Sequence, residues 1–170
     1  MRWWKALALG VVMAAAGAAR ADEIAAPKNV GAEPSTPQSA ELSSRSATAE
    51  MLGNPQYSLK LADDAIQADA KDPWPYYDKG VALARVGQID GAVAAFTAAE
   101  QHFAPNDRWG KSVAVFGRAH ALAQAGRCGE ARQAFDQYAE LIPDDPGSVA
   151  LAHRYANECH EGGAPPAPAK

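Results

Sequence analysis

Residues 74–103 read WPYYDKGVALARVGQIDGAVAAFTAAEQHF and carry the clearest structural signal in the chain. Tyr76, Gly80 and Leu83 follow one another at intervals of four and three, which places them on one face of a helix. Gly87 predicts the end of that helix, because glycine readily adopts the left-handed conformation found there. A second run of apolar residues with helical spacing follows and reaches Phe103. The segment therefore predicts two helices joined by a tight turn.

This helix pair resembles the tetratricopeptide repeat (TPR), in which two antiparallel helices cross at small residues. Gly80 and Ala92 stand at the small positions, where the two helix axes must approach to about 8 Å. The other matching positions are the core residues Leu83, Phe96 and Ala99 and the turn residue Gly87.

The same pattern recurs on both sides of this segment. The later copy starts 39 residues after Gly80 and contains Ala119, Leu122, Gly126, Ala131 and Phe135, with Tyr138 at a usually small position and Pro143 after the second helix. The earlier copy starts 34 residues before Gly80 and contains Ser46, Ala49, Gly53, Ser58, Ala62 and Ala65. It keeps the turn glycine and the small positions but lacks the large core residues, so it is degenerate.

The resemblance implies an all-α fold, a TPR-like α-solenoid of antiparallel helix pairs over residues 39–160. It would contain two clear repeats, one degenerate repeat and a C-terminal cap helix over residues 148–160, since such arrays need a polar outer face at their ends. An unrelated bundle of alanine-rich helices is the alternative. So few repeats make a small core, and homo-oligomerisation therefore stays open.

The two ends of the chain predict export and flexible flanks. Residues 1–5 are basic, residues 6–19 are uncharged and apolar, and Ala19-Arg20-Ala21 is a small-x-small site, which together predict a signal peptide over residues 1–21. We expect cleavage after Ala21 and a periplasmic or secreted protein of exported bacterial type, without stable membrane insertion. A retained anchor is the alternative, although a spanning helix needs about 20 apolar residues. Residues 22–38 predict a flexible linker, and residues 161–170 a disordered Pro/Ala tail.

The charge of the chain argues against two classes of partner. The formal net charge is −4, and it becomes −7 without residues 1–21, which hold three basic residues and no acid. Nucleic-acid binding depends on neutralising phosphates with basic side chains, and anionic membranes attract basic segments in the same way. We expect neither partner.

Cys128 and Cys159 are the only two cysteines in the chain. Export would bring them into an oxidising compartment, where disulfides persist. Cys128 lies near the start of the last repeat's second helix and Cys159 at the end of the expected cap helix, and an antiparallel cap would return beside that start. The hypothesis is a structural disulfide. A redox pair would favour a Cys-x-x-Cys spacing, which is absent.

No combination of residues predicts catalysis, a metal site or a cofactor. His153 and His160 are seven residues apart, whereas zinc ligands come in closer pairs with further ligands nearby. The adjacent carboxylates Asp144 and Asp145 flank prolines and fit a turn better than an acid–base pair. We therefore expect a protein that is not an enzyme.

The resemblance also implies a binding site, because the first helix of each TPR lines a concave groove that holds a partner. By register, the groove residues are Trp74, Tyr77, Val81, Arg85, Phe116, His120 and Gln124. Aromatic and Arg side chains dominate interface energetics, so the expected function is a non-catalytic scaffold module of the cell envelope that binds a protein or peptide segment. These side chains could instead pack on neighbouring helices. A periplasmic protein that binds a small molecule or metal with the aromatic residues and His120 is the alternative function.

Overall fold

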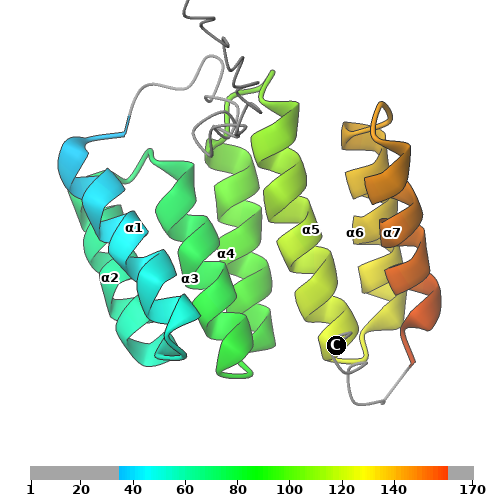
Figure 1. Cartoon of the computed structure of the whole chain (residues 1–170), viewed down its shortest axis with the longest axis horizontal. Helices are drawn as coiled ribbons and strands as arrows, with labels where there is room; N and C mark the ends of the chain where they lie inside the picture. The colour runs from blue at the N-terminus through cyan, green and yellow to red at the C-terminus, as the bar shows by residue number, and fades with distance from the viewer. Residues whose placement is uncertain (1–34, 161–170) are drawn as a thin grey trace, which may run out of the picture.

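The computed structural model describes residues 35–160, which form a row of seven helices (Figure 1). The helices are α1 (Pro37–Met51), α2 (Pro55–Ala68), α3 (Pro73–Arg85), α4 (Ile89–His102), α5 (Arg108–Gln124), α6 (Cys128–Leu141) and α7 (Pro146–Glu158). The expected signal peptide, most of the expected linker and the expected tail lie outside the described residues. None of the helices within residues 35–160 combines the length and apolar character that crossing a membrane requires.

Three glycines end the first helix of each pair. Gly53, Gly87 and Gly126 have φ of 72°, 77° and 71°, in the left-handed region that side chains disfavour. These are the turn glycines expected from the repeat register, including the one in the degenerate first copy. The sequence prediction of three helix pairs is confirmed.

The start of α1 differs from the expected domain boundary. The sequence placed residues 37 and 38 in the linker, whereas α1 begins at Pro37. The Thr36 side chain caps this helix by accepting a hydrogen bond from the Ser39 amide at 3.3 Å. Pro37 was misassigned to the linker because proline is also favoured at the first position of a helix, where no amide donor is needed.

The helices form two layers with different contacts. Each helix packs against the next in sequence, and in addition α1 contacts α3, α3 contacts α5, and α5 contacts α7. Within residues 35–160, α2, α4 and α6 make no such contacts with one another. The row α1, α3, α5 and α7 is therefore the more tightly spaced one and forms the inner, concave face.

Phe96 is the centre of the packing between the second and third pairs. Its side chain is 2% exposed. A Cβ atom built on Gly80 of α3 would lie 2.7 Å from Phe96 Cδ1, and one built on Gly117 of α5 would lie 2.6 Å from Phe96 Cε1. The ring is thus enclosed between two glycine backbones, and any side chain at either position would collide with it. Gly80 has the role that the repeat register predicted.

The first pair is held together partly by polar groups. The Ser46 hydroxyl lies 2.9 Å from the Ser58 hydroxyl and donates to the Ser58 carbonyl, also at 2.9 Å. Both serines are fully buried, with Ala62 and Ala65 on the same helix face. The small serines allow α1 and α2 to approach, and their mutual hydrogen bonds satisfy groups that would be unfavourable to bury alone. This degenerate copy thus forms a pair with polar contacts and small residues, together with one large buried apolar side chain, Leu61, which is 3% exposed.

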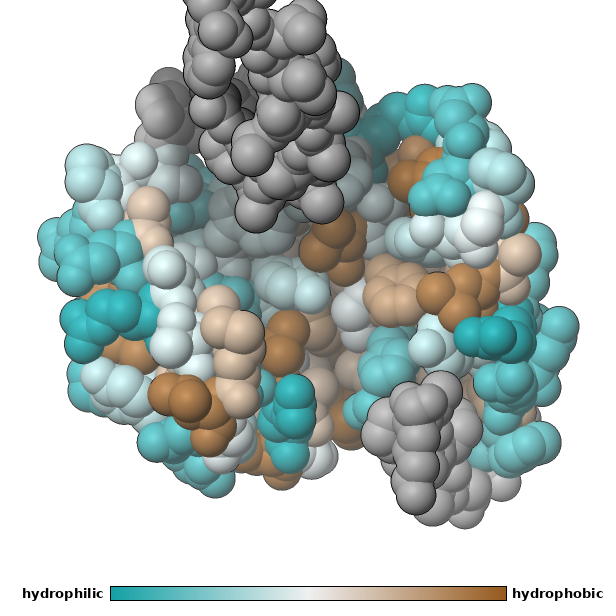
Figure 2. Space-filling model, in the orientation of Figure 1, coloured by the Kyte–Doolittle hydropathy of each residue, from teal (hydrophilic) through white to brown (hydrophobic). Residues whose placement is uncertain are grey.

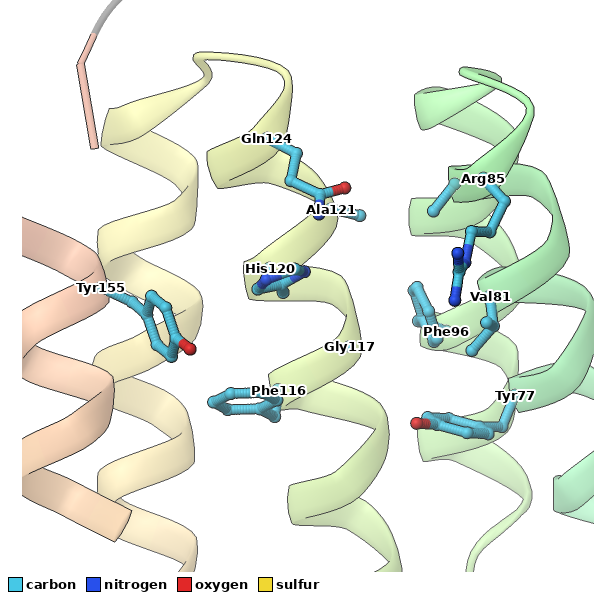
Figure 3. Close-up of a pocket in the computed structure, with 11 residues that line it drawn as sticks. Tyr77, Val81, Arg85, Phe96, Phe116, Gly117, His120, Ala121, Gln124 and Tyr155 are labelled. Atoms are coloured by element: carbon cyan, nitrogen blue, oxygen red, sulfur yellow. The ribbon is translucent and has the colours of Figure 1, made fainter. Parts of the chain in front are cut away.

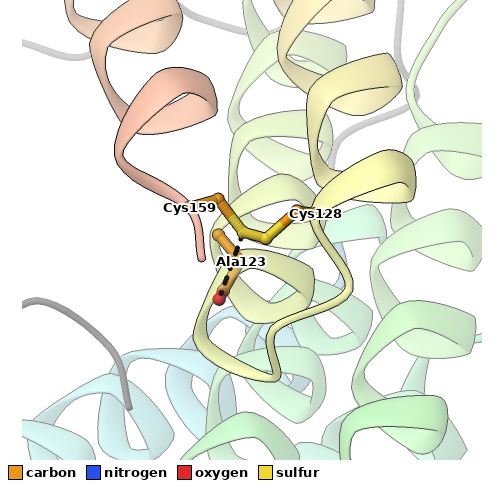
Figure 4. Close-up of a disulfide and its surroundings, with 3 residues drawn as sticks. All are labelled: Ala123, Cys128 and Cys159. Carbon is orange, nitrogen blue, oxygen red and sulfur yellow. Dashed lines mark hydrogen bonds between the residues drawn. A yellow bond between two sulfur atoms is a disulfide. The ribbon is translucent and has the colours of Figure 1, made fainter. Parts of the chain in front are cut away.

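The cap helix α7 is covalently joined to α6. The structure contains a disulfide between Cys128 and Cys159, with the two Cα atoms 5.5 Å apart (Figure 4). The Cys159 sulfur also lies 3.7 Å from the Ala123 carbonyl oxygen near the end of α5. The predicted pairing, inferred from an antiparallel cap, is confirmed. The bond brings the end of α7 beside both helices of the last repeat.

Candidate functional site

The inner face contains a pocket of about 370 Å³ between α3, α5 and α7. Its walls are formed by Tyr77, Val81, Ala84, Arg85, Phe96, Phe116, Gly117, His120, Ala121, Gln124 and Tyr155. Figure 2 shows this face hollowed near its centre, with apolar residues inside and hydrophilic residues at both sides. We call this pocket the groove.

Six of the seven residues expected at the binding site line the groove. Their side chains come from two inner helices, Tyr77, Val81 and Arg85 from α3 and Phe116, His120 and Gln124 from α5 (Figure 3). In each helix they are spaced by four residues, so successive turns present them on one side. The repeat register thus predicted which helix faces meet here. Their role in binding stays a prediction.

Trp74 is the seventh expected residue, and it does not line the groove. Its indole packs edge-on against Phe103, with ring centroids 5.2 Å apart, and contacts Trp109 at 5.8 Å. Trp74 lies in the first turn of α3, beside Trp109 in the first turn of α5. The register of one helix could not show that the start of α5 and the end of α4 surround this side chain.

Sequence reasoning missed Gly117 and Tyr155 as residues that shape the groove. Tyr155 extends from α7 toward His120 and Phe116, with ring centroids 5.7 and 6.1 Å away (Figure 3). The cap was expected to face solvent, so its aromatic residue was not considered. A usable signal existed, because Ala152, Tyr155 and Ala156 have the spacing of a buried helix stripe.

The aromatic residues of the groove support one another. Phe116 packs against Phe135 at 5.8 Å and Tyr138 at 5.1 Å, behind the groove surface. Tyr77 lies 5.5 Å from Phe96, whose ring forms the floor. Rings packed on several sides have little rotamer freedom to lose, so a ligand that contacts them meets a preformed surface.

Every polar side chain that lines the groove can donate a hydrogen bond. No Asp or Glu among residues 35–160 lines it, although acidic residues outnumber basic ones in the chain. Arg85 lies at its edge, with Nε 3.4 Å from a Glu50 carboxylate oxygen on α1. Burial lowers the pKa of His120, which is therefore neutral at pH 7 and offers one N–H donor. Burial likewise raises the pKa of Tyr77, whose hydroxyl stays protonated. The groove thus suits a ligand that presents apolar surface and acceptor oxygens.

A buried acidic cluster lies on the α1 side of α3. Asp78 accepts a hydrogen bond from the Ser43 hydroxyl, and Asp72 accepts one from the Ser39 hydroxyl at 2.8 Å. Burial, together with the carboxylates of Asp72 and Glu50, raises the pKa of Asp78 to about 7, against the opposing effect of Ser43. Because this pKa is raised, the folded protein holds the proton more tightly than the unfolded chain. Stability should therefore fall as pH rises from about 4 to about 7, and level off above that range.

Replacing Asp78 with asparagine should remove this pH dependence. Asparagine keeps an acceptor for Ser43 and cannot ionise. A pKa shift of this size represents roughly 4 kcal/mol. At pH 8 we expect the free energy of unfolding of the variant to be higher by about 2 kcal/mol, a part of that amount. At pH 4, where Asp78 is already protonated, the gain should disappear. Thermal unfolding followed by circular dichroism at pH 4, 6 and 8 measures this. Parallel pH profiles for the two proteins would contradict the assignment.

Residues that could hold a metal do not converge in the described part of the chain. Within residues 35–160, no group of three His, Cys, Asp or Glu side chains is placed to bind an ion. A polar cluster between α4, α5 and α6 is a closed set of ion pairs and hydrogen bonds. Arg118 binds Glu100 at 2.8 Å and Gln137 at 2.6 Å, and Gln137 binds Glu100 at 2.6 Å. These mutual bonds join α4, α5 and α6 and fit a structural role.

Comparison with known proteins identifies the architecture. No protein-family model and no curated protein matches this chain. Among solved structures, the chain is similar to the first TPR domain of Spaghetti (RPAP3) bound to the HSP90 peptide SRMEEVD, with a TM-score of 0.59 and 15% sequence identity. The match covers 71% of this chain and 94% of that one. The chain has the TPR fold. The three helix pairs are three TPR units, α7 is the cap, and the groove lies on the concave face of the TPR array.

Proposed function

We propose that this protein is a non-catalytic adaptor that binds a segment of another protein in the TPR groove. The observation that carries the proposal is the groove itself, a largely aromatic and apolar surface that no acidic residue among residues 35–160 lines and that continues across three successive inner helices. Its aromatic residues and Arg85 are the residue types enriched at protein interfaces. A groove that crosses several helices suits an elongated ligand, because each helix contributes contacts along its length.

The similar solved structure supports a peptide as the ligand class. The first TPR domain of Spaghetti is described with an HSP90 peptide bound. We infer the same general mode here, a peptide segment held by the inner helices, with different specificity. Some TPR domains bind the C-terminal carboxylate of a peptide with Lys, Arg and Asn side chains from successive first helices. By resemblance, the corresponding places in this chain hold Tyr77, Asp78, Phe116 and Gly117, so we infer that this groove favours apolar surface over a terminal carboxylate.

The sequence and the disulfide support a place in the cell envelope. Residues 1–21 have the pattern of a signal peptide, and Cys128 and Cys159 form a disulfide that an oxidising compartment would preserve. We propose that the adaptor acts in the periplasm or after secretion. Fractionation of the producing cells, with an antibody to the protein, tests this location. Recovery of full-length protein from the cytoplasm would overturn it.

A photo-crosslinking residue in the groove tests the binding proposal. A diazirine side chain at Ala84 would lie in the groove, whereas the same side chain at Ala94 would lie on the exposed outer face of α4. We expect a defined protein partner to be crosslinked from position 84 and not from position 94. Equal crosslinking from both positions, or none from position 84, would contradict the groove assignment.

Filling the groove should abolish partner binding without unfolding the protein. Val81→Lys places a long side chain in the pocket, and its charge can extend toward water at the rim. We expect at least a tenfold loss of partner crosslinking from position 84, since large side chains there block the contact surface. The matched control is Ala94→Lys on the outer face, which should leave crosslinking unchanged. Gln124→Trp is a second variant, because it fills the other end of the groove from an exposed position.

The volume of the groove also admits a small-molecule ligand. About 370 Å³ falls in the range of ordinary ligand sites, and His120 with the aromatic walls could orient such a ligand. Metal chelation has no cluster of ligands within residues 35–160. A thermal-shift screen with metabolites separates the two functions, because a ligand that binds only the folded state raises its melting temperature.

A further inference from the structure

The chemistry of the groove points to a particular kind of peptide. Aromatic rings line its walls, and the polar groups around them are rich in N–H and O–H donors, from Arg85, His120, Gln124 and the two tyrosines. Proline-rich segments in the polyproline II conformation present apolar rings, lack N–H groups at each proline and leave their carbonyl oxygens without internal partners. Aromatic-lined grooves recognise such segments because little conformational entropy is lost on binding. The groove is therefore complementary to a proline-rich strand.

The chain itself contains such a segment. Residues 164–168 read Ala-Pro-Pro-Ala-Pro and follow two glycines at 162 and 163. The segment carries no charge, so the acid-free groove and the uncharged strand can meet without burying an unpaired ion. Proline at three of five positions favours the polyproline II conformation before binding.

The disulfide fixes the place from which this segment starts. It holds Cys159 beside Cys128 and 3.7 Å from the Ala123 carbonyl, one residue before Gln124 at the end of the groove. Tyr155 lies one turn earlier on α7 and already faces the groove (Figure 3). Whatever follows His160 thus begins at the Gln124 end of the groove.

The reach of the segment matches the length of the groove. A polyproline II strand advances about 3.1 Å per residue, so Pro168 can lie about 25 Å from His160. The distance along α5 from Gln124 to Phe116 is about 12 Å at 1.5 Å per residue. In this conformation residues 164–168 themselves span about 12 Å, which matches the groove, and the glycines at 162 and 163 allow the connection from His160 to be shorter than its extended length. The proline-containing segment before α1 is less well placed, since it joins the domain at Thr36, on the edge formed by α1 and bonded to Asp69.

We propose that residues 164–168 bind in the groove of their own chain as a polyproline strap that competes with the partner. The inference rests on the proposed function, because it takes the groove to be a peptide site. A tethered segment has an effective concentration in the millimolar range, which is sufficient for a weak strap to occupy the groove. A partner must then bind more tightly than the strap, and the strap sets the threshold for binding.

Crosslinking within the full mature chain tests the strap directly. A diazirine side chain at Ala167 should react with residues of α3 and α5 that line the groove, in monomeric protein, as mapped by mass spectrometry. Val81→Lys should reduce these crosslinks at least fivefold, and so should the triple change Pro165→Ser, Pro166→Ser and Pro168→Ser. Ala94→Lys on the outer face should have no effect. Gln124→Trp provides an independent groove-filling variant if Val81→Lys unfolds.

Three results would overturn the strap. The first is crosslinking only to the outer surfaces of α6 and α7, and the second is no intrachain crosslink at all. The third is crosslinking between chains that grows with protein concentration, which would place the segment in the groove of a second copy.

A second measurement separates the strap from the proposed function. Partner crosslinking from position 84 should rise at least threefold in the triple Pro→Ser variant, because a competitor has been removed. An unchanged partner signal overturns the strap while the groove remains a partner site. If no partner is crosslinked from position 84 of the parent protein or of the triple variant, while the intrachain crosslink is observed, the proposed function alone would be overturned.

Discussion

Replacing Phe96 with alanine should lower the free energy of unfolding by about 3–5 kcal/mol, a large part of the stability of a domain this size. The ring is 2% exposed and contacts helices α3 and α5 at once, so its removal leaves a cavity that neither helix can fill alone. Urea unfolding followed by the helical signal at 222 nm measures the loss. A change below 1 kcal/mol would show that Phe96 does not join the second and third TPR units.

The glycines beside Phe96 provide a matched test of the same contact. Gly80→Ala should destabilise the protein by about 1–3 kcal/mol, because the new Cβ would lie 2.7 Å from the ring. In an open helical position the same change is stabilising by about 0.5–1 kcal/mol. Gly129 offers that control, since a Cβ there would meet nothing within 4 Å. Phe96→Leu should partly rescue Gly80→Ala, and additive effects of the two changes would contradict the packing described here.

The helix pairs could be predicted from the sequence because the repeat constrains each of them several times. Gly87 marks a turn by its residue type, Phe96 and Gly80 mark a crossing by their sizes, and the same register recurs around Gly126 and Phe135. Each of these signals is local and depends only on backbone conformation or side-chain volume. Agreement between them made the fold predictable even though the first pair buries Ser46 and Ser58 between its two helices.

The parts of the groove that were not predicted depend on contacts between elements distant in sequence. Tyr155 reaches the groove because α7 packs beside α5, and Trp74 packs instead against Phe103 and Trp109 from two other helices. Gly117 looked unremarkable because its neighbour, Phe96, belongs to another repeat. The repeat register shows which face of one helix points inward. It does not show which side chain from a second element completes that face.

Removing the disulfide should lower the free energy of unfolding by about 3–4 kcal/mol. The bond joins residues 31 apart, and a cross-link that closes a loop of this length restricts the unfolded chain by about that amount. The double variant Cys128→Ser and Cys159→Ser removes it without leaving a reactive thiol. Thermal unfolding of this variant, in oxidising buffer, should show a clearly lower melting temperature than the parent protein.

The loss of stability should be concentrated in α7, and a local effect of this kind can be distinguished from a general loss of stability. Among the inner helices α7 contacts only α5, and its buried residues are the two small alanines Ala152 and Ala156, so the cross-link to α6 supplies much of its attachment. Hydrogen exchange should therefore rise in residues 146–158 of the double variant well before it rises in α3 or α4. Reductant should bring the parent protein to the same state and leave the double variant unchanged. Because Tyr155 forms one wall of the groove, a released cap would also weaken groove binding. Hydrogen exchange that rises uniformly across all helices would contradict this prediction, since it would show that the disulfide stabilises the fold only as a whole.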